Sequence, residues 1–350
     1  MLVRDPVFQL NLLLWMAKEQ PADAYVVRPL FFEQGYSILY IENPFPFPPD
    51  TLRAIEESKK EISKKPEPEL ILGRMRDKTA LYFEAKANSF SSESETSKQA
   101  RGHLLAAGEA FAEVMAPLRS CLLCYVVPED NRPLMGVCLH ELAAELATAG
   151  LKPSLHSCHG LAVESPSLRY SWDDSFRKHV GIAESSSVIM SGITEDTDPS
   201  PLFLIYTDED YPDDEQRDLL RRCLVNQVHA LLVCDINRVP PNELYQCSAE
   251  SLLIEITDDL FRFLGRARQK GMRRLVTENV LRRIAEFSKD KYSGAVVVQG
   301  QQLLIRFPDE STKTAFLDWL EDFKRTTFQA KKPSDADKGT LFEQIEEDES

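Results

Sequence analysis

The stretch from Glu69 to Lys86, ELILGRMRDKTALYFEAK, predicts a β-hairpin whose strand pairing is fixed by its turn. Turn-forming residues lie in its middle, and strand-forming residues flank them on both sides. If Arg76-Asp77 is the centre of a symmetric turn, Gly73 lies opposite Ala80. Because side chains alternate between the two faces of a sheet, this register decides which of them meet.

The same register gathers charged side chains at the open end of the hairpin. Glu69 falls opposite Glu84, and Lys86 lies two residues beyond Glu84 on the same face. Two carboxylates facing each other across a ladder repel, and a divalent cation would remove that cost. The cluster therefore predicts a cation site. The alternative is a solvent-facing strand with alternating charges.

Composition bounds the size and the partners of the protein. A chain of 350 residues is long enough for two cores. The net charge of −15 argues against a protein whose whole surface binds nucleic acid, since phosphates require a basic face. A local basic groove or a basic protein partner remains compatible with this charge.

The seven cysteines indicate a reducing compartment, because their number is odd and several lie in apolar runs. A zinc site is disfavoured, since Cys121 and Cys124 are three apart in a predicted strand and so point to opposite faces. We find no convincing signal peptide and no run of about 18 apolar residues. We therefore expect a soluble cytoplasmic protein with no membrane segment.

The order of predicted elements indicates an α/β fold with two domains. Helices and strands alternate, which favours a mixed sheet flanked by helices over residues 1–170. A second α/β domain is predicted over residues 171–329, with strands at 202–206 and 230–235 joined by a helix at 214–228. Residues 330–350 are polar and acidic and predict a disordered tail.

The hairpin and the element order together resemble the PD-(D/E)xK nuclease superfamily, which has the restriction-endonuclease-like fold. The resemblance covers roughly residues 1–165, and its core motif is Pro68-Glu69 followed by Glu84-Ala85-Lys86. Gln99 and His103 resemble the Gln-x-x-x-(Tyr/His) feature of some branches. Glu33 lies where the helix-to-strand entry of the fold sometimes supplies a further glutamate.

The resemblance implies a divalent-metal-dependent nuclease acting on DNA or, less often, on RNA. Glu69 and Glu84 would hold Mg²⁺ or Mn²⁺, with Glu33 as a further metal ligand. Lys86 would assist the attacking water, and Gln99 would orient Lys86 or a phosphate. Such nucleases commonly act in host-defence or repair assemblies. The alternative is an inactive adaptor subunit that binds a protein partner, because Glu69 stands where the family usually has aspartate.

Two charged stretches lie outside the hairpin. The acidic run at 208–215 predicts a solvated loop before a helix. A basic stretch stands out in so acidic a chain and predicts contact with nucleic-acid phosphates or with acids of the chain itself. Its cations are Arg266, Arg268, Lys270, Arg273 and Arg274. The sequence leaves the oligomeric state open.

Overall fold

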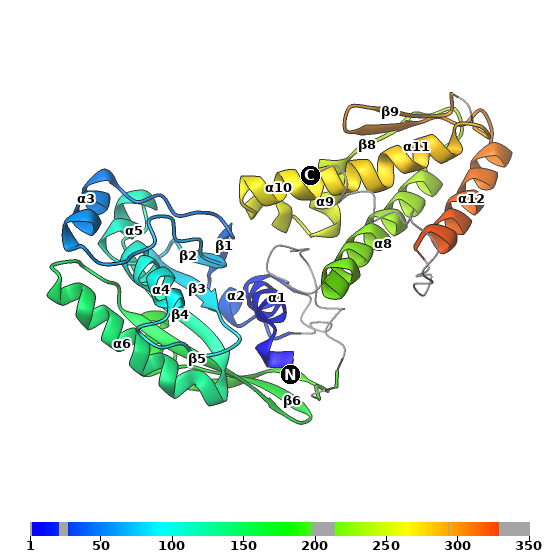
Figure 1. The fold of residues 1–350 in the computed structure, drawn as a ribbon. Coiled ribbons are helices and arrows are strands. Elements are labelled where there is room, and N and C mark those ends of the chain that lie inside the picture. The colour runs from blue at the N-terminus through cyan, green and yellow to red at the C-terminus, as the bar shows by residue number, and fades with distance from the viewer. Residues whose placement is uncertain (1, 21–26, 195, 198–213, 293, 329–350) are drawn as a thin grey trace. The chain divides into compact units, whose positions relative to one another are not determined.

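The computed structural model describes residues 2–20, 27–194, 196–197, 214–292 and 294–328. The chain forms two compact units (Figure 1). Unit 1 contains Met1–Phe203 and Phe263–Gly265, and unit 2 contains Leu204–Arg262 and Arg266–Ser350. The expected boundary between residues 170 and 171 falls inside a strand, so unit 1 is longer than the sequence predicted.

Unit 1 is built around a seven-stranded mixed sheet whose strands follow chain order. The first three strands and the last three pair antiparallel, and the central strands β3, β4 and β5 run parallel. The strands are β1 (Ser37–Ile41), β2 (Leu70–Arg74), β3 (Thr79–Ala85), β4 (Ser120–Pro128), β5 (His156–Glu164), β6 (Ser167–Ser171) and β7 (Ser186–Ser191).

Helices cover both faces of this sheet. One face carries α3 (Pro49–Ser58), α4 (Glu95–Ala106), α5 (Glu109–Val114) and α6 (Arg132–Thr148), which share a core with the sheet. The other face contacts α1 (Pro6–Ala17), α2 (Leu30–Glu33) and α7 (Asp174–Val180). Unit 1 also contains the short 3-10 turns η1 (Leu2–Arg4) and η2 (Glu129–Asn131).

Alternation along β3 sends neighbouring side chains into different cores. Tyr82 packs among the residues of the α4 and α6 side, whereas Phe83 lies 5.1 Å from the ring of Phe31 on α2. Both side chains are fully buried. A strand that is buried on both faces suits the central, parallel part of a sheet. The next residue, Glu84, therefore points toward α4.

The predicted hairpin register is confirmed. Gly73 lies opposite Ala80, and Leu70 lies opposite Phe83. The turn is held by buried Arg74, whose guanidinium lies 2.7 Å from Asp77 and 4.6 Å from the centre of the Tyr36 ring. Arg74 thus forms an ion pair with Asp77 and a cation–π contact with Tyr36. These two contacts anchor the turn end of the hairpin.

Unit 2 consists of helices and a small antiparallel sheet in the order β8-β10-β9. Its strands are β8 (Tyr245–Ser248), β9 (Val296–Gln299) and β10 (Gln302–Ile305). Its helical elements are α8 (Asp214–Arg238), α9 (Ala249–Ile256), η4 (Leu260–Phe263), α10 (Arg266–Val276), the π-helical η5 (Thr277–Leu281), α11 (Arg282–Ser288) and α12 (Glu310–Phe328).

The predicted strand at 230–235 is wrong, because these residues belong to the long helix α8. Val225, Val228, Leu232 and Ile236 are all buried, at the spacing of one helical face. Residues 230–235 therefore cannot form one of the two strands of the parallel pair that the sequence predicted for unit 2. The other predicted strand, at 202–206, lies outside the described residues, as do most of the acidic run and the tail at 330–350.

Candidate functional site

The hairpin register brings Glu69 to the predicted position at the end of β2. Leu70 pairs with Phe83, so the next position outward sets Glu69 opposite Glu84. The Glu69 Oε2 atom accepts a hydrogen bond of 3.1 Å from the backbone N–H of Ala85. This bond holds one glutamate carboxylate against the backbone of the strand that carries the other.

Glu84 and Lys86 meet on one face of β3, as their spacing predicted. The Lys86 Nζ atom lies 2.7 Å from Glu84 Oε1. The Glu84 side chain is 5% exposed and that of Lys86 is 26% exposed, so the carboxylate is buried while the ammonium reaches toward solvent.

A buried histidine on α4 closes the inner side of the cluster. The Nε2 atom of His103 lies 3.5 Å from Glu84 Oε2, and its Nδ1 atom lies 2.8 Å from the hydroxyl of Tyr82. Burial is the main cause that lowers the pKa of His103; the Glu84 carboxylate opposes this shift and the Lys86 ammonium adds to it. A neutral imidazole that accepts from Tyr82 through Nδ1 carries its proton on Nε2, facing Glu84.

Two buried oxygens of the cluster have no hydrogen bond within the described part of the chain. They are Glu84 Oε2 and the hydroxyl of Tyr125, which lies beside Glu84 on β4. Burial raises the pKa of Tyr125, and the negative charges of Glu84 and Glu69 raise it further. Buried polar atoms are normally satisfied, so this spot suits a cation or an ordered water.

The donor set fits a hard divalent cation with few protein ligands. Among the described residues no group of three or more His, Cys, Asp or Glu side chains is arranged to hold a metal ion. Mg²⁺ commonly binds through one or two carboxylates and completes its shell with water. Glu69 and Glu84 meet that requirement, and Tyr125 offers a further polar oxygen.

Two further predicted site residues are Gln99 and Glu33. Gln99 is exposed on α4, one turn before His103. Glu33 ends α2 and lies 2.9 Å from Arg28, with which it forms an ion pair. Strand β1 begins opposite Gly73, which lies at the turn end of the hairpin. Gly73 is about 13 Å from Glu69 along β2. The structure therefore does not bring Glu33 to the cluster.

The acidic residue that β1 does bring to Glu69 is Glu42. Ile41 pairs with Leu70, and the Glu42 N–H donates to the carbonyl of Glu69 at 3.1 Å. Glu42 is 4% exposed. Glu42 was not predicted as a site residue, although extending the pairing of β1 with β2 to its last residue places Glu42 beside Glu69.

The predicted phosphate-contacting cations all lie on α10 in unit 2. Arg273 forms an ion pair of 3.0 Å with Glu250 of α9. Arg266, Lys270 and Arg274 are exposed, and Arg268 is partly buried. One helix thus gathers these cations, with some of them facing solvent.

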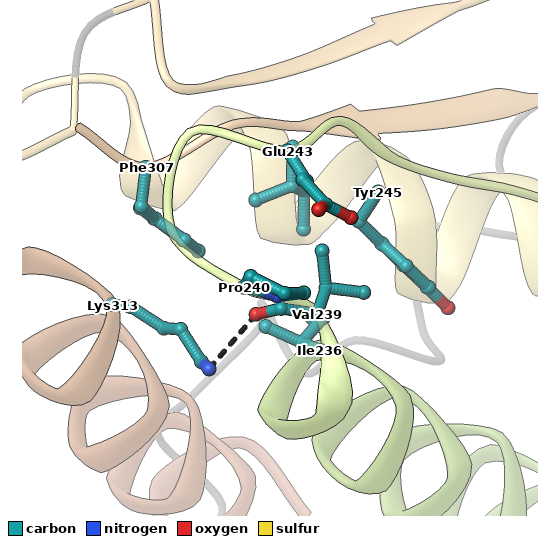
Figure 2. A pocket seen from close by; sticks show the side chains of 8 residues that line it. Ile236, Val239, Pro240, Glu243, Tyr245, Phe307 and Lys313 are labelled. Carbon is teal, nitrogen blue, oxygen red and sulfur yellow. Dashed lines mark hydrogen bonds between the residues drawn. The ribbon is translucent and has the colours of Figure 1, made fainter. Parts of the chain in front are cut away.

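A small apolar hollow in unit 2 has a structural role. Figure 2 shows its lining, which includes Ile236 and Phe307, with Lys313 at one side. The Lys313 Nζ atom donates to the carbonyls of Asn237 and Val239, each at 2.9 Å. Lys313 therefore satisfies the C-terminal carbonyls of α8, as a helix end requires.

No family model matches the chain, and neither the curated proteins nor the solved structures give a match. Within the described residues, no helix combines the length and apolar character needed to cross a membrane. All seven cysteines are free thiols, and burial raises the pKa of Cys158 to about 12, which makes that thiol a poor nucleophile.

Proposed function

We propose that unit 1 is a divalent-metal-dependent nuclease domain that hydrolyses phosphodiester bonds, with DNA as the favoured substrate. The observation that carries the proposal is the meeting of Glu69, Glu84 and Lys86 at one end of the hairpin. The mixed sheet with a helix between parallel β3 and β4 agrees with the restriction-endonuclease-like fold that the sequence resembles.

Each side chain of the cluster has a role that follows from its contacts. Glu69 and Glu84 would hold Mg²⁺ or Mn²⁺, and the bound cation would polarise a phosphodiester and activate water. The Ala85 N–H fixes the carboxylate of Glu69. Lys86 would place its positive charge beside the bound phosphate and stabilise the charge that develops there.

The inner side of the cluster keeps Glu84 in place. The imidazole of His103, oriented by Tyr82, limits how far Glu84 can turn toward the core. Burial of Glu84 and Tyr125 excludes bulk water, which strengthens electrostatic interactions with a bound phosphate. The carboxylates of Glu69 and Glu84 are thereby held in place and partly shielded from bulk water.

Cleavage assays on the full chain test this function. Linear DNA, plasmid DNA and RNA are incubated with Mg²⁺, with Mn²⁺ or with a chelator. We expect metal-dependent cleavage that falls about 100-fold or more in Glu84→Gln and in Lys86→Met. Glu57→Gln and Lys178→Met remove the same charges from exposed positions elsewhere in unit 1 and should retain activity. Cleavage that survives both site substitutions would refute the site.

The Glu84–Lys86 ion pair favours a second candidate, a non-catalytic adaptor that binds a protein partner. The ammonium already compensates the buried carboxylate, so the pair is stable without a cation. Thermal unfolding with and without Mg²⁺ or Mn²⁺ separates the candidates, because a ligand of the folded state raises the Tm. An unchanged Tm together with no cleavage of any substrate would favour the adaptor.

A further inference from the structure

Helix α10 is the most basic segment in the described part of the chain. Its sequence RARQKGMRRLV contains five cations and no acidic residue. It continues through η5 into α11, so that residues 266–288 form one unbroken helical rod (Figure 1). In a chain of net charge −15, five cations without an acid on one helix create a local field of the opposite sign.

The buried side of α10 fixes which side faces out. Met272 and Val276 are buried in unit 2. Arg273 is tied to Glu250 of α9 at 3.0 Å, and the amide of Gln269 donates to the carbonyl of Phe261 at 3.1 Å. These contacts hold the rotation of the helix about its own axis, so the opposite side is presented as a rigid surface.

The outward face alternates cations with the smallest side chains. Arg266, Lys270 and Arg274 are exposed at intervals of four residues, and exposed Ala267 and Gly271 lie beside them. Arg266 and Lys270 form no ion pair with any other described residue. A Cβ atom added to Gly271 would meet no heavy atom within 4 Å. The face therefore combines positive charge with small side chains, which leave the helix backbone accessible.

Several acids near α10 are already paired with arginines that lie outside this face. Glu278 binds Arg282 at 2.7 Å, and Asp259 binds Arg262 at 3.0 Å. Glu250 is paired with Arg273, as described above. These three carboxylates therefore do not compensate the charges of Arg266 and Lys270 on the outward face.

We propose that the outward face of α10, defined by Arg266, Ala267, Lys270, Gly271 and Arg274, docks on the backbone of duplex DNA. The major groove of B-form DNA admits an α-helix, and small residues between cations let the helix backbone come close to the phosphates. Helix α10 carries no aromatic residue on which unpaired bases could stack, which argues against a single-stranded ligand.

This docking surface goes beyond the proposed nuclease function and is tested without it. Binding of the full chain to a fluorescent duplex of about 20 base pairs is followed by anisotropy, in chelator, from about 50 to 200 mM salt. Removing two phosphate contacts in Arg266→Gln/Lys270→Gln should reduce the salt slope of log K by about 1.8 and weaken binding. Glu57→Gln, which changes an exposed residue of unit 1 outside the proposed site, should bind as the wild type does.

Two further variants complete the design. Lys289→Gln/Lys291→Gln removes the same charge just beyond the far end of the rod and should retain the wild-type slope. Gly271→Leu fills open space without touching the fold, so it should weaken binding while the Tm is unchanged or raised by the better helix propensity of leucine. The proposal would be overturned if both double variants lost duplex binding equally. It would also be overturned if the wild type bound single strands more tightly than the duplex, or showed no salt-dependent binding.

Discussion

The Lys86 ammonium lies 2.7 Å from Oε1 of Glu84, and this ion pair joins a buried carboxylate to a partly exposed cation. Such a pair contributes little net free energy over an apolar replacement, yet breaking it leaves a charge buried without its partner. The pair therefore constrains both the folding and the chemistry of unit 1, and the two constraints can be measured apart.

Lys86→Met should lower the free energy of unfolding by about 1–3 kcal/mol, because Glu84 then stays buried without its cation. The figure lies below that for fully buried pairs, since the lysine side chain is partly exposed. Urea unfolding provides the measurement. The double variant Glu84→Gln/Lys86→Met should regain part of the loss, and purely additive effects of the two substitutions would contradict the coupling.

The two tyrosines of the cluster should respond oppositely to loss of their hydroxyl groups. Tyr82→Phe removes the hydrogen bond to His103 and should destabilise unit 1 by about 1–2 kcal/mol. Tyr125→Phe removes a buried hydroxyl without a hydrogen bond in the described residues and should be neutral or stabilising. Chemical unfolding in chelator compares them, and equal losses would show that Tyr125 does have a partner.

Acid should destabilise unit 1 partly through His159, which lies on the opposite face of the sheet. Burial lowers the pKa of His159 to about 3, and its Nδ1 atom lies 2.5 Å from the Tyr170 hydroxyl. The unfolded imidazole has a pKa near 6.5, so below that pH the unfolded state binds the extra proton. Stability from this residue is full above pH 6.5 and is lost as pH falls toward 3.

The loss should amount to roughly 1.4 kcal/mol per pH unit for this single group. Tyr170→Phe/His159→Phe removes the group together with its partner and should flatten the pH profile of the unfolding free energy relative to Tyr170→Phe alone. Replacing exposed His140 with Gln provides the comparison and should leave the slope unchanged. A profile of the same steepness in all variants would assign the acid sensitivity to other groups.

Two glycine-to-alanine substitutions should differ in sign. Gly271 is exposed inside α10 with open space around it, so Gly271→Ala should stabilise unit 2 by about 0.5–1 kcal/mol through helix propensity. At Gly108 a Cβ atom would collide with the backbone carbonyl of Lys152, so Gly108→Ala should destabilise unit 1. Differential scanning calorimetry reports both, and a lowered Tm for Gly271→Ala would contradict the first.

The hairpin could be predicted from the sequence because turn residues and strand alternation agree on one register. The pairing of Gly73 with Ala80 followed from the turn alone. The break between helices α4 and α5 could not be predicted in this way, since it lies at Gly108, where a side chain has no room. Close approach of a distant backbone segment is a tertiary effect that local patterns do not carry.

Other differences between the predicted and the observed elements have causes in the local sequence. The apolar run at 230–235 is short enough to suit a buried strand, and only the wider spacing from Val225 to Ile236 shows the helix. Strands β6 and β7 each begin and end with serine, which is not among the residues enriched in strands, so their sequences give a weak strand signal. The resemblance pointed to Glu33, whereas the pairing of β1 with β2 brings Glu42 to Glu69.

The chain leaves unit 1 after Phe203 and returns to it for three residues only, Phe263–Gly265. There Leu264 forms a parallel bridge with Ile41, and the Gly265 N–H donates to the Ile41 carbonyl at 3.1 Å. A fragment that stops at residue 203 would therefore lack a backbone partner for the end of β1, directly before Glu42. The smallest autonomous piece of this protein that preserves the glutamate cluster is expected to need residues well beyond the first sheet.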